Sequence, residues 1–280
     1  MKILVINSGS SSIKFKLIDI ENEDQLAEGL IERVGLPEGR IKFKAGDRTI
    51  ILEEPVPDHR AGLSFVLDAL TNEEYGPLES YSEIEAVGHR VVHGGEKFTS
   101  SVIIDNNVIE GIKECSFMAP LHNPHNLQGI RASMETLPEV PNVAVFDTAF
   151  HQTMPPVSYI YPLPYKVFEE MRMRRFGFHG PSHQYVAMKA GEMMDKPLEE
   201  LCIVTCHLGN GSSLTAVRHG KSIDTSLGYG TACGVMMGTR SGDVDSAVLI
   251  DLVEHHGYSI EEVKEMVYKK SGVAGISGIS

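Results

Sequence analysis

Two short turns rich in glycine and serine, each set between apolar strands, constrain this fold more than any other feature of the sequence. One turn lies in Cys206-His207-Leu208-Gly209-Asn210-Gly211-Ser212-Ser213, which follows Leu201–Thr205, a predicted buried strand, and precedes the strand Leu214–Val217. Glycine permits positive φ and has no Cβ to block a ligand, and the N–H groups of such a turn can converge on an anion. By itself, the pattern predicts only a β-hairpin.

A second turn of the same kind lies near the N-terminus. There Asn7–Ser12 separates the strand Ile3–Ile6 from the alternating stretch Ile13–Ile18. Gly9-Ser10-Ser11 and Gly211-Ser212-Ser213 are the same tripeptide in the same strand–turn–strand setting, so we expect two similar domains that face each other across a cleft. Both polar turns would then meet one ligand, and nucleotide phosphates suit such turns.

The length of the chain limits the number of domains, and its net charge limits the classes of binding partner. A chain of 280 residues can bury a large core and favours two domains; the proline-rich stretch Met154–Pro164 separates them, so we place the domains at residues 1–150 and 151–280. The net charge of −13, with no Lys/Arg run longer than Arg174-Arg175, argues against nucleic acid and anionic membranes as partners. An acidic protein that binds anions must use individual arginines, which makes arginines inside apolar motifs informative.

The cysteines and the N-terminus indicate the compartment. No C-x-x-C motif is present, which excludes a zinc ribbon and a thioredoxin motif. Cys202 and Cys206 fall on one face of a strand, and we expect them to be buried free thiols in a reducing cytosol. Met1-Lys2 leads straight into a strand, with no signal peptide and no apolar run long enough to span a membrane. The sequence therefore predicts a cytoplasmic protein.

The spacing of apolar residues predicts the remaining elements. Three short strands at Glu28–Arg33, Ile41–Lys44 and Thr49–Leu52 continue the first hairpin as an antiparallel meander, which differs from a Rossmann unit. Asp58 is a predicted N-cap for a helix that ends at Leu70. Further helices are predicted at Asn106–Phe117, Asn126–Leu137, Ser182–Met194 and Ile260–Lys270, and one from the Gly238–Asp245 loop to about His255.

Two strands carry charged side chains in apolar surroundings. Arg90 lies inside the strand Glu85–Gly95, where an arginine must reach solvent or meet an anion; a structural ion pair and a ligand contact both remain open. The histidines on either side, His89 and His93, are expected to be core or surface residues. Asp147 ends the apolar part of the strand Asn142–His151, at the end where α/β sheets tend to place ligand-handling residues, so we favour a functional role.

Several familiar catalytic motifs are excluded. His179 and His183 have the i, i+4 spacing of a zinc helix, but a glycine and a proline separate them and no glutamate follows His179. The P-loop, the protein-kinase motifs and the G-x-S-x-G elbow are missing. The candidate functional features that remain include two polar turns and a second arginine, Arg240, in a glycine-flanked loop. Phosphoryl transfer requires such a set, because it needs cations and donors around a phosphoryl group rather than a protein nucleophile.

Seven segments together resemble the acetokinase family, nearly end to end and in family order. The matching segments are Val5–Lys14, Gly88–Gly95, Pro120–Pro124, Phe146–Gln152, Phe176–Gly180, His207–Gly211 and Met237–Gly242. The resemblance implies an α/β fold of duplicated ribonuclease-H-like domains, as in the actin, sugar-kinase and Hsp70 superfamily, with an interdomain cleft. It implies reversible, in-line phosphoryl transfer from Mg-ATP to acetate, giving acetyl phosphate and ADP. A homodimer follows from the resemblance alone.

The resemblance also implies roles for individual residues. Asp147 is the expected acidic catalytic residue, and His179 and Arg240 are expected to stabilise the transition state. Asn7 is expected to help hold Mg²⁺. The expected contacts with ATP are Lys14, His207, Leu208, Gly209, Asn210 and Gly211, whereas the short-chain carboxylate is expected to meet Arg90 and a methyl pocket walled by Val92, Leu121 and Phe178.

The sequence departs from the family pattern at three places. Gly230–Gly234 stands where the family usually has T-P-L-E-G, so that Thr231 replaces a proline of the acyl pocket, and Pro181 replaces a threonine after His179-Gly180. The chain ends at Ser280, where the family continues with a further nucleotide-binding segment, and the second domain is therefore expected to be truncated. Two alternatives follow: a propionate or butyrate kinase with the same mechanism, and a truncated paralogue without activity.

Overall fold

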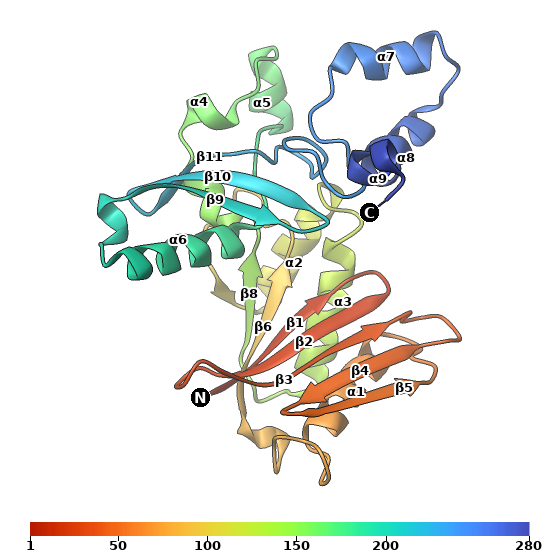
Figure 1. Cartoon of the computed structure of the whole chain (residues 1–280), viewed down its shortest axis with the longest axis vertical. Coiled ribbons are helices and arrows are strands. Elements are labelled where there is room, and N and C mark those ends of the chain that lie inside the picture. Colours follow the sequence, from red (N-terminus) through yellow and green to blue (C-terminus); the bar gives the residue numbers. More distant parts are fainter. Residues whose placement is uncertain (280) are drawn as a thin grey trace. The chain divides into compact units, whose positions relative to one another are not determined.

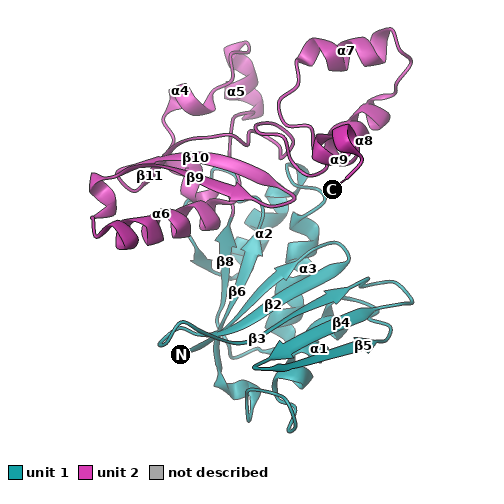
Figure 2. Ribbon diagram, in the orientation of Figure 1, with its two compact units in different colours: residues 1–146 teal, residues 147–280 magenta. Residues whose placement is uncertain are grey.

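The chain forms two compact units, of which the first comprises Met1–Phe146 and the second starts at Asp147 (Figure 2). A computed structural model describes residues 1–279. Each unit combines strands with helices, in agreement with the predicted α/β class (Figure 1). Within the described part of the chain, none of the helices combines the length and the apolar character needed to cross a membrane.

The first unit is built on a mixed eight-stranded sheet with the order β5-β4-β3-β2-β1-β6-β8-β7. Strands β1 to β5 are successive antiparallel neighbours, which confirms the predicted meander, while β6 and β8 run parallel to β1. The strands are β1 (Lys2–Ser8), β2 (Ser12–Asp19), β3 (Asp24–Glu32), β4 (Arg40–Ala45), β5 (Arg48–Glu53), β6 (Ile84–Val91), β7 (Val102–Ile103) and β8 (Asn142–Phe146).

Three helices accompany this sheet: α1 (His59–Leu70), α2 (Asn106–Glu114) and α3 (Asn123–Thr136), with short 3₁₀ turns at Tyr81–Glu83 and Cys115–Phe117. Helix α1 begins as predicted, because the Asp58 side chain accepts a hydrogen bond from the Ala61 N–H at 2.8 Å. Helix α3 begins three residues before the predicted start. Its first turn contains Pro124, and a proline is tolerated there because the N–H it lacks would have no partner within the helix.

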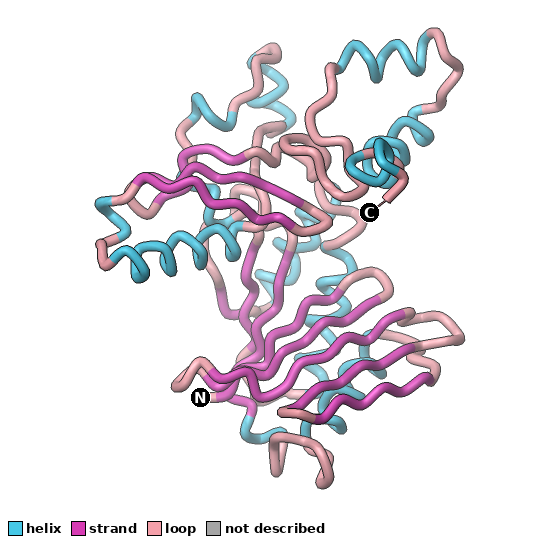
Figure 3. The backbone as a smooth tube through the Cα atoms, in the orientation of Figure 1, coloured by secondary structure: helices cyan, strands magenta, loops and turns pink. Residues whose placement is uncertain are grey.

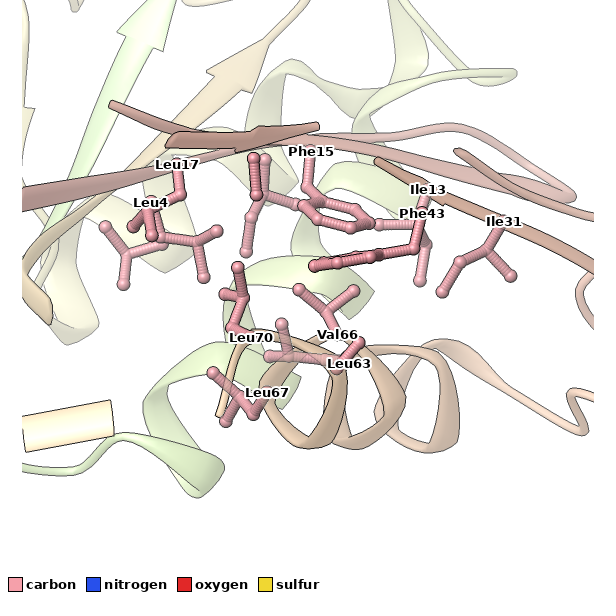
Figure 4. Close-up of a cluster of buried hydrophobic side chains, with 14 of the residues drawn as sticks. Leu4, Ile13, Phe15, Leu17, Ile31, Phe43, Leu63, Val66, Leu67 and Leu70 are labelled. Atoms are coloured by element: carbon pink, nitrogen blue, oxygen red, sulfur yellow. The ribbon is translucent and has the colours of Figure 1, made fainter. Parts of the chain in front are cut away.

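The core of the first unit lies between one face of the meander and α1 (Figure 4). Alternate residues of β1 and β2, such as Leu4, Phe15 and Leu17, are at most 3% exposed and point towards Leu63 and Leu70 of α1. Side chains alternate between the two faces of a strand, so the intervening residues lie on the opposite face. This alternation fixes which side of the sheet is free to carry functional groups.

The second unit contains a three-stranded antiparallel sheet with the order β11-β10-β9 and helix α6 beside β9 (Figure 1). A long connection, residues 226–245, joins β11 to α7 and carries Arg240 (Figure 3). The elements are η3 (Ala149–Thr153), α4 (Pro156–Tyr159), α5 (Tyr165–Met171), α6 (Gly180–Met194), η4 (Leu198–Glu200), β9 (Cys202–Leu208), β10 (Ser212–Arg218), β11 (Lys221–Thr225), α7 (Ser246–Glu254), α8 (Ile260–Lys269) and α9 (Gly272–Ser277).

Two expectations from the sequence, one for each unit, are wrong. Cys202 and Cys206 are exposed rather than buried, because α6 covers the face of β9 that carries Thr205, and the cysteines alternate onto the opposite face. The strand predicted over Asn142–His151 stops at Phe146. The chain then turns through the 3₁₀ helix η3, so Asp147 stands where the strand ends.

Candidate functional site

The β1–β2 hairpin places Asn7 and Lys14 directly opposite each other. Both lie on the face of the sheet away from the core, where Asn7 is half-buried and Lys14 is exposed. They border a groove of about 630 Å³, whose floor continues over β3 and β4 and carries three further lysines, Lys16, Lys42 and Lys44. Anionic groups suit such a positively charged groove.

The turn after β1 is held in place by two side chains from other elements. The Gly9 N–H donates to the Ser12 carbonyl at 2.8 Å, and His59 Nε2–H donates to the Gly9 carbonyl at 2.8 Å. The Ser8 carbonyl accepts a hydrogen bond from Asn126 Nδ2 at 2.8 Å. The turn is therefore pre-organised by α1 and α3, which matters for any group that must bind through its backbone.

The same asparagine fixes the end of β6, which carries the predicted acyl-binding residues. Asn126 Oδ1 accepts a hydrogen bond from the Val92 N–H at 3.2 Å. Val92 is buried and Arg90 is half-buried, whereas Leu121, in the turn before α3, is 63% exposed. One buried amide thus links the ends of β1 and β6.

The histidine beside Arg90 belongs to the core. His89 is 2% exposed, and its Nε2–H donates to Asn142 Oδ1 at 2.7 Å. Burial lowers the pKa of His89 from 6.5 to about 4. His93 is likewise buried, so both histidines are core residues, one of the two placements expected for them.

In the second unit, three of the predicted site residues surround the start of α6. Asp147 is buried, and its carbonyl accepts a hydrogen bond from the Gly180 N–H at 2.9 Å. Phe178 is buried, and its carbonyl accepts a hydrogen bond from His151 Nε2–H at 2.9 Å. His179 is the N-cap of α6 with φ +60°, a left-handed conformation that is costly for a residue other than glycine and that tends to cluster at functional sites.

Proline at position 181 fits this helix start. Pro181 occupies the first turn of α6, where no intrahelical partner exists for an N–H. The departure from the family threonine is thus compatible with the helix.

The β9–β10 hairpin brings its predicted nucleotide-binding turn next to His179. The imidazole of His207 stacks on that of His179, with ring centroids 4.1 Å apart, and His207 Nδ1 is 2.9 Å from Ser182 Oγ. The tripeptides Gly9-Ser10-Ser11 and Gly211-Ser212-Ser213, however, are not equivalent in position. Gly9 directly follows β1 as Gly209 follows β9, so the matching of these two tripeptides was wrong.

Arg240 and His179 converge on Gly211. A Cβ built on Gly211 would lie 3.4 Å from Arg240 Nη1 and 3.5 Å from His179 Nε2. Arg240 Nη1 also donates to the Thr231 carbonyl at 3.0 Å, which links this arginine to the residue that departs from the family pattern. A glycine at this turn therefore leaves space between a guanidinium and an imidazole, which is suitable for an anion.

The loop that carries Arg240 is fixed by main-chain hydrogen bonds to the region of α9. The N–H groups of Ser271, Val273 and Ala274 donate to the carbonyls of Thr239, Met237 and Gly238 at 2.9–3.0 Å. Gly272, at φ +67°, permits this close approach, since a Cβ there would lie 2.1 Å from the Met237 carbonyl oxygen.

Buried polar residues that no sequence pattern singled out lie behind His179. His183 Nε2 lies 2.7 Å from Ser213 Oγ and His183 Nδ1 lies 2.7 Å from Thr205 Oγ1, while Ser213 Oγ lies 2.8 Å from His179 Nδ1. Burial, with a smaller effect from neighbouring histidines, lowers the pKa of His183 to about 3. The repeated serine turn was a signal for Ser213, but only the fold shows which side chain it meets.

The described residues contain no group of three or more His, Cys, Asp or Glu side chains that could hold a metal ion. Mg²⁺ in nucleotide enzymes keeps several waters and binds through few protein oxygens together with phosphates. Asn7, whose amide oxygen is a hard donor, is half-buried and lines the groove that carries the lysines.

The fold matches a class of solved phosphotransferase structures. The acetate kinase of Porphyromonas gingivalis superposes with a TM-score of 0.96 and 47% identity over all of this chain and 70% of the other. A propionate kinase of Francisella tularensis subsp. tularensis gives a TM-score of 0.92 and 40% identity over 99% of this chain and 70% of the other. These matches confirm the predicted α/β fold class.

Sequence comparison identifies the protein family. The profile of the acetokinase family matches residues 2–280, and the acetate kinase of Alkaliphilus metalliredigens is 53% identical over the whole chain, which spans 71% of that protein. The acetate kinase of Thermoanaerobacterium thermosaccharolyticum is 52% identical over the whole chain and 70% of its own length. The chain belongs to the acetokinase family, a family of phosphotransferases, as the sequence motifs predicted.

Proposed function

We propose that the chain transfers the γ-phosphoryl group of ATP to acetate in a reversible, in-line reaction. A carboxylate oxygen of acetate forms the new bond to phosphorus, the bond from phosphorus to the bridging oxygen breaks, and ADP leaves with that electron pair. The products are acetyl phosphate and ADP. The observation that carries the proposal is the convergence of Arg240 Nη1 and His179 Nε2 on Gly211, because phosphoryl transfer is accelerated mainly by donors and charge aimed at the transferring group.

The substrate-binding residues have separate roles in this proposal. Arg90 binds the carboxylate through its planar guanidinium, and Val92, Leu121 and Phe178 are the residues that contact the methyl group of the acid. Lys14 and the turn His207–Gly211 contact the phosphates of ATP.

The residues around the reacting group complete the assignment. Asp147 is the acidic catalytic residue, and His179 and Arg240 stabilise the transition state. Asn7 holds Mg²⁺ together with the nucleotide, and the ion, when bound, neutralises phosphate charge. Asn7 is half-buried and lies opposite Lys14 in the β1–β2 pair, which supports this assignment.

A longer acid is the second candidate substrate. It is supported by the match to a propionate kinase structure and by Thr231, which stands where the family usually has a proline of the acyl pocket. One methylene in such a pocket changes kcat/KM by about 10- to 200-fold, which an assay resolves easily.

The test is acyl phosphate formation, trapped as the hydroxamate with hydroxylamine. Mg-ATP is offered with acetate, propionate and butyrate in turn to wild type, to Arg240→Ala and to Arg218→Ala, whose side chain is exposed at the end of β10. We expect Arg240→Ala to lower kcat by about 10³-fold, since arginines at transferring phosphoryl groups contribute about that much, and Arg218→Ala to behave as wild type. Absence of product with all three acids would overturn the proposal and favour the inactive paralogue.

The remaining parts of the proposal concern assembly and compartment. We infer a homodimer from the family resemblance, which sedimentation velocity tests directly. A reducing cytoplasm is supported by four free cysteines, at positions 115, 202, 206 and 233.

A further inference from the structure

The two peptide groups that flank His179 are both held by the short segment at the start of the second unit. On the N-terminal side, the Phe178 carbonyl accepts a hydrogen bond from His151 Nε2–H at 2.9 Å. On the C-terminal side, the Gly180 N–H donates to the Asp147 carbonyl at 2.9 Å. The orientations of the two flanking peptide groups set the φ and ψ angles of a residue, so this segment determines the backbone conformation of His179.

The conformation that results is left-handed. His179 has φ +60° and ψ +22°, a region that is costly for a residue with a Cβ and that persists only where the surrounding structure imposes it. The same angles determine the direction in which the imidazole leaves the main chain. Its Nε2 lies 3.5 Å from the Cβ position of Gly211, and Arg240 Nη1 lies 3.4 Å from that position.

The hydrogen-bonding state of His151 follows from the chemistry of its partners. The Phe178 carbonyl can only accept, so Nε2 must carry a hydrogen. Burial lowers the pKa of His151 from 6.5 to about 4, so the ring is neutral at pH 7 and has no second hydrogen. Nδ1 is therefore bare, and its 2.9 Å contact with Ser222 Oγ requires the serine hydroxyl to donate.

The position of the His151 ring is fixed by packing as well. His151 and Ser222 are both 0% exposed. The Thr153 hydroxyl donates to the Ser222 carbonyl at 2.8 Å, which ties η3 to β11. On its other side the ring lies against Gly177, at φ +74°, where a Cβ would be only 2.8 Å from His151 Cδ2. The ring is therefore held in the place from which it donates to Phe178.

We propose that His151 is a positioning residue that imposes the left-handed conformation of His179 and thereby directs its imidazole towards Gly211 and Arg240. This inference rests on the proposed function for its catalytic meaning. His151 acts through the main chain of Phe178 rather than at the reacting group. Without its donor, the peptide group between residues 178 and 179 is free to rotate, which relieves the strain and moves the imidazole away from the transferring phosphoryl group.

The test is the backbone conformation of His179 in the full chain, measured by NMR at pH 7 without ligand. A left-handed residue gives a strong nuclear Overhauser effect between its own amide hydrogen and Hα, because these hydrogens are closer than in a helix or strand. We expect a strong His179 signal in wild type and a weak one in His151→Asn, whose shorter side chain keeps an acceptor near Ser222 but does not reach Phe178. Asp195, left-handed at φ +50° at the other end of α6, is the internal control and should stay strong.

His151→Gln is the matched variant, because its amide nitrogen can take the place of Nε2 and donate to Phe178. It should keep the strong His179 signal. In the acyl phosphate assay, His151→Asn should lower kcat by up to about 100-fold with little change in the KM for ATP or acetate, and His151→Gln should recover most of this loss.

A strong His179 signal in folded His151→Asn would overturn the proposal, as would a weak one in wild type. The ring of His151 gives a further measurement that needs no variant to fold: ¹⁵N–¹H correlations of wild type should show a protonated Nε2 and a bare Nδ1, and a bare Nε2 would refute the argument. The NMR measurements require no turnover, so their result stands even if the chain forms no acyl phosphate.

Discussion

Gly129→Ala should destabilise the first unit, although the same change stabilises most helices. Gly129 lies in the middle of α3, where alanine is normally more favourable than glycine by about 1 kcal/mol. Here, a Cβ on residue 129 would lie 2.1 Å from Ser8 Oγ and 2.8 Å from Ser8 Cβ. Rotation of the side chain can relieve the first contact, but the second requires β1 or α3 to move, and Ser8 is only 4% exposed.

The expected change in the free energy of unfolding follows from these opposing effects. Extra carbon atoms in a packed interior cost about 1–3 kcal/mol, and a contact below 3 Å with an immobile atom places this site in the upper half of that range. After subtraction of the helix gain, the free energy of unfolding should fall by about 1–2 kcal/mol. Because Ser8 adjoins Asn7, the KM for Mg-ATP should rise in the same variant.

Urea unfolding followed by circular dichroism measures the change. Gly88→Ala in β6 is the matched control, since nothing lies within 4 Å of its Cβ position and little change is expected. Adding Ser8→Gly to Gly129→Ala should restore most of the lost stability, because it removes both atoms of the clash. A Gly129→Ala variant as stable as wild type would refute the argument that this contact sets the separation of α3 and β1.

Two further predictions concern pH and thiol chemistry. His89 has a pKa of about 4 in the folded chain and an ordinary pKa of 6.5 when unfolded, so the unfolded state takes up the proton first as the pH falls. Stability should therefore be lost between pH 6.5 and 4, by up to about 3 kcal/mol, and His89→Gln should flatten this part of the profile in urea titrations; an unaltered slope would exclude His89 as the source. Cys202 and Cys206 should react with an aromatic disulfide reagent in the native chain, whereas Cys115, which is buried and has a raised pKa, should react only on unfolding. Protection of both exposed cysteines in peptide mapping would contradict the structure of β9.

The meander and the first helix were predictable because local sequence determines them. Leu4, Phe15 and Phe43 alternate with polar residues at the period of a strand, and Asp58 marks a helix start that the structure confirms. The family, and with it the fold class, followed from the motifs.

Which face of β9 is covered could not be predicted in this way. Cys202, Val204 and Cys206 look like buried residues in the sequence, yet the neighbour that covers β9, helix α6, packs on the side of Thr205. A period of two separates the faces of a strand but does not indicate which one is buried.

The positioning groups were missed for a related reason. Asn126 and His183 act on residues more than 20 positions away in the sequence, and such contacts leave no spacing to recognise. The i, i+4 pair His179 and His183 even resembled a metal site, whereas in the fold a serine hydroxyl lies between their nitrogens. Local sequence patterns therefore identify candidate residues, whereas only the tertiary structure shows which side chains they contact.

The hydrogen bonds that fix the Arg240 loop have a consequence for the order in which the molecule is made. The ribosome delivers the chain from its N-terminus, and domains fold as units once their residues have emerged. The sheet of the first unit is complete only when β8 appears, since β8 lies between β6 and β7. The loop that carries Arg240 can take its final conformation only later, because the N–H donors that hold it extend to Ala274. Ala274 is synthesised 34 residues after Arg240.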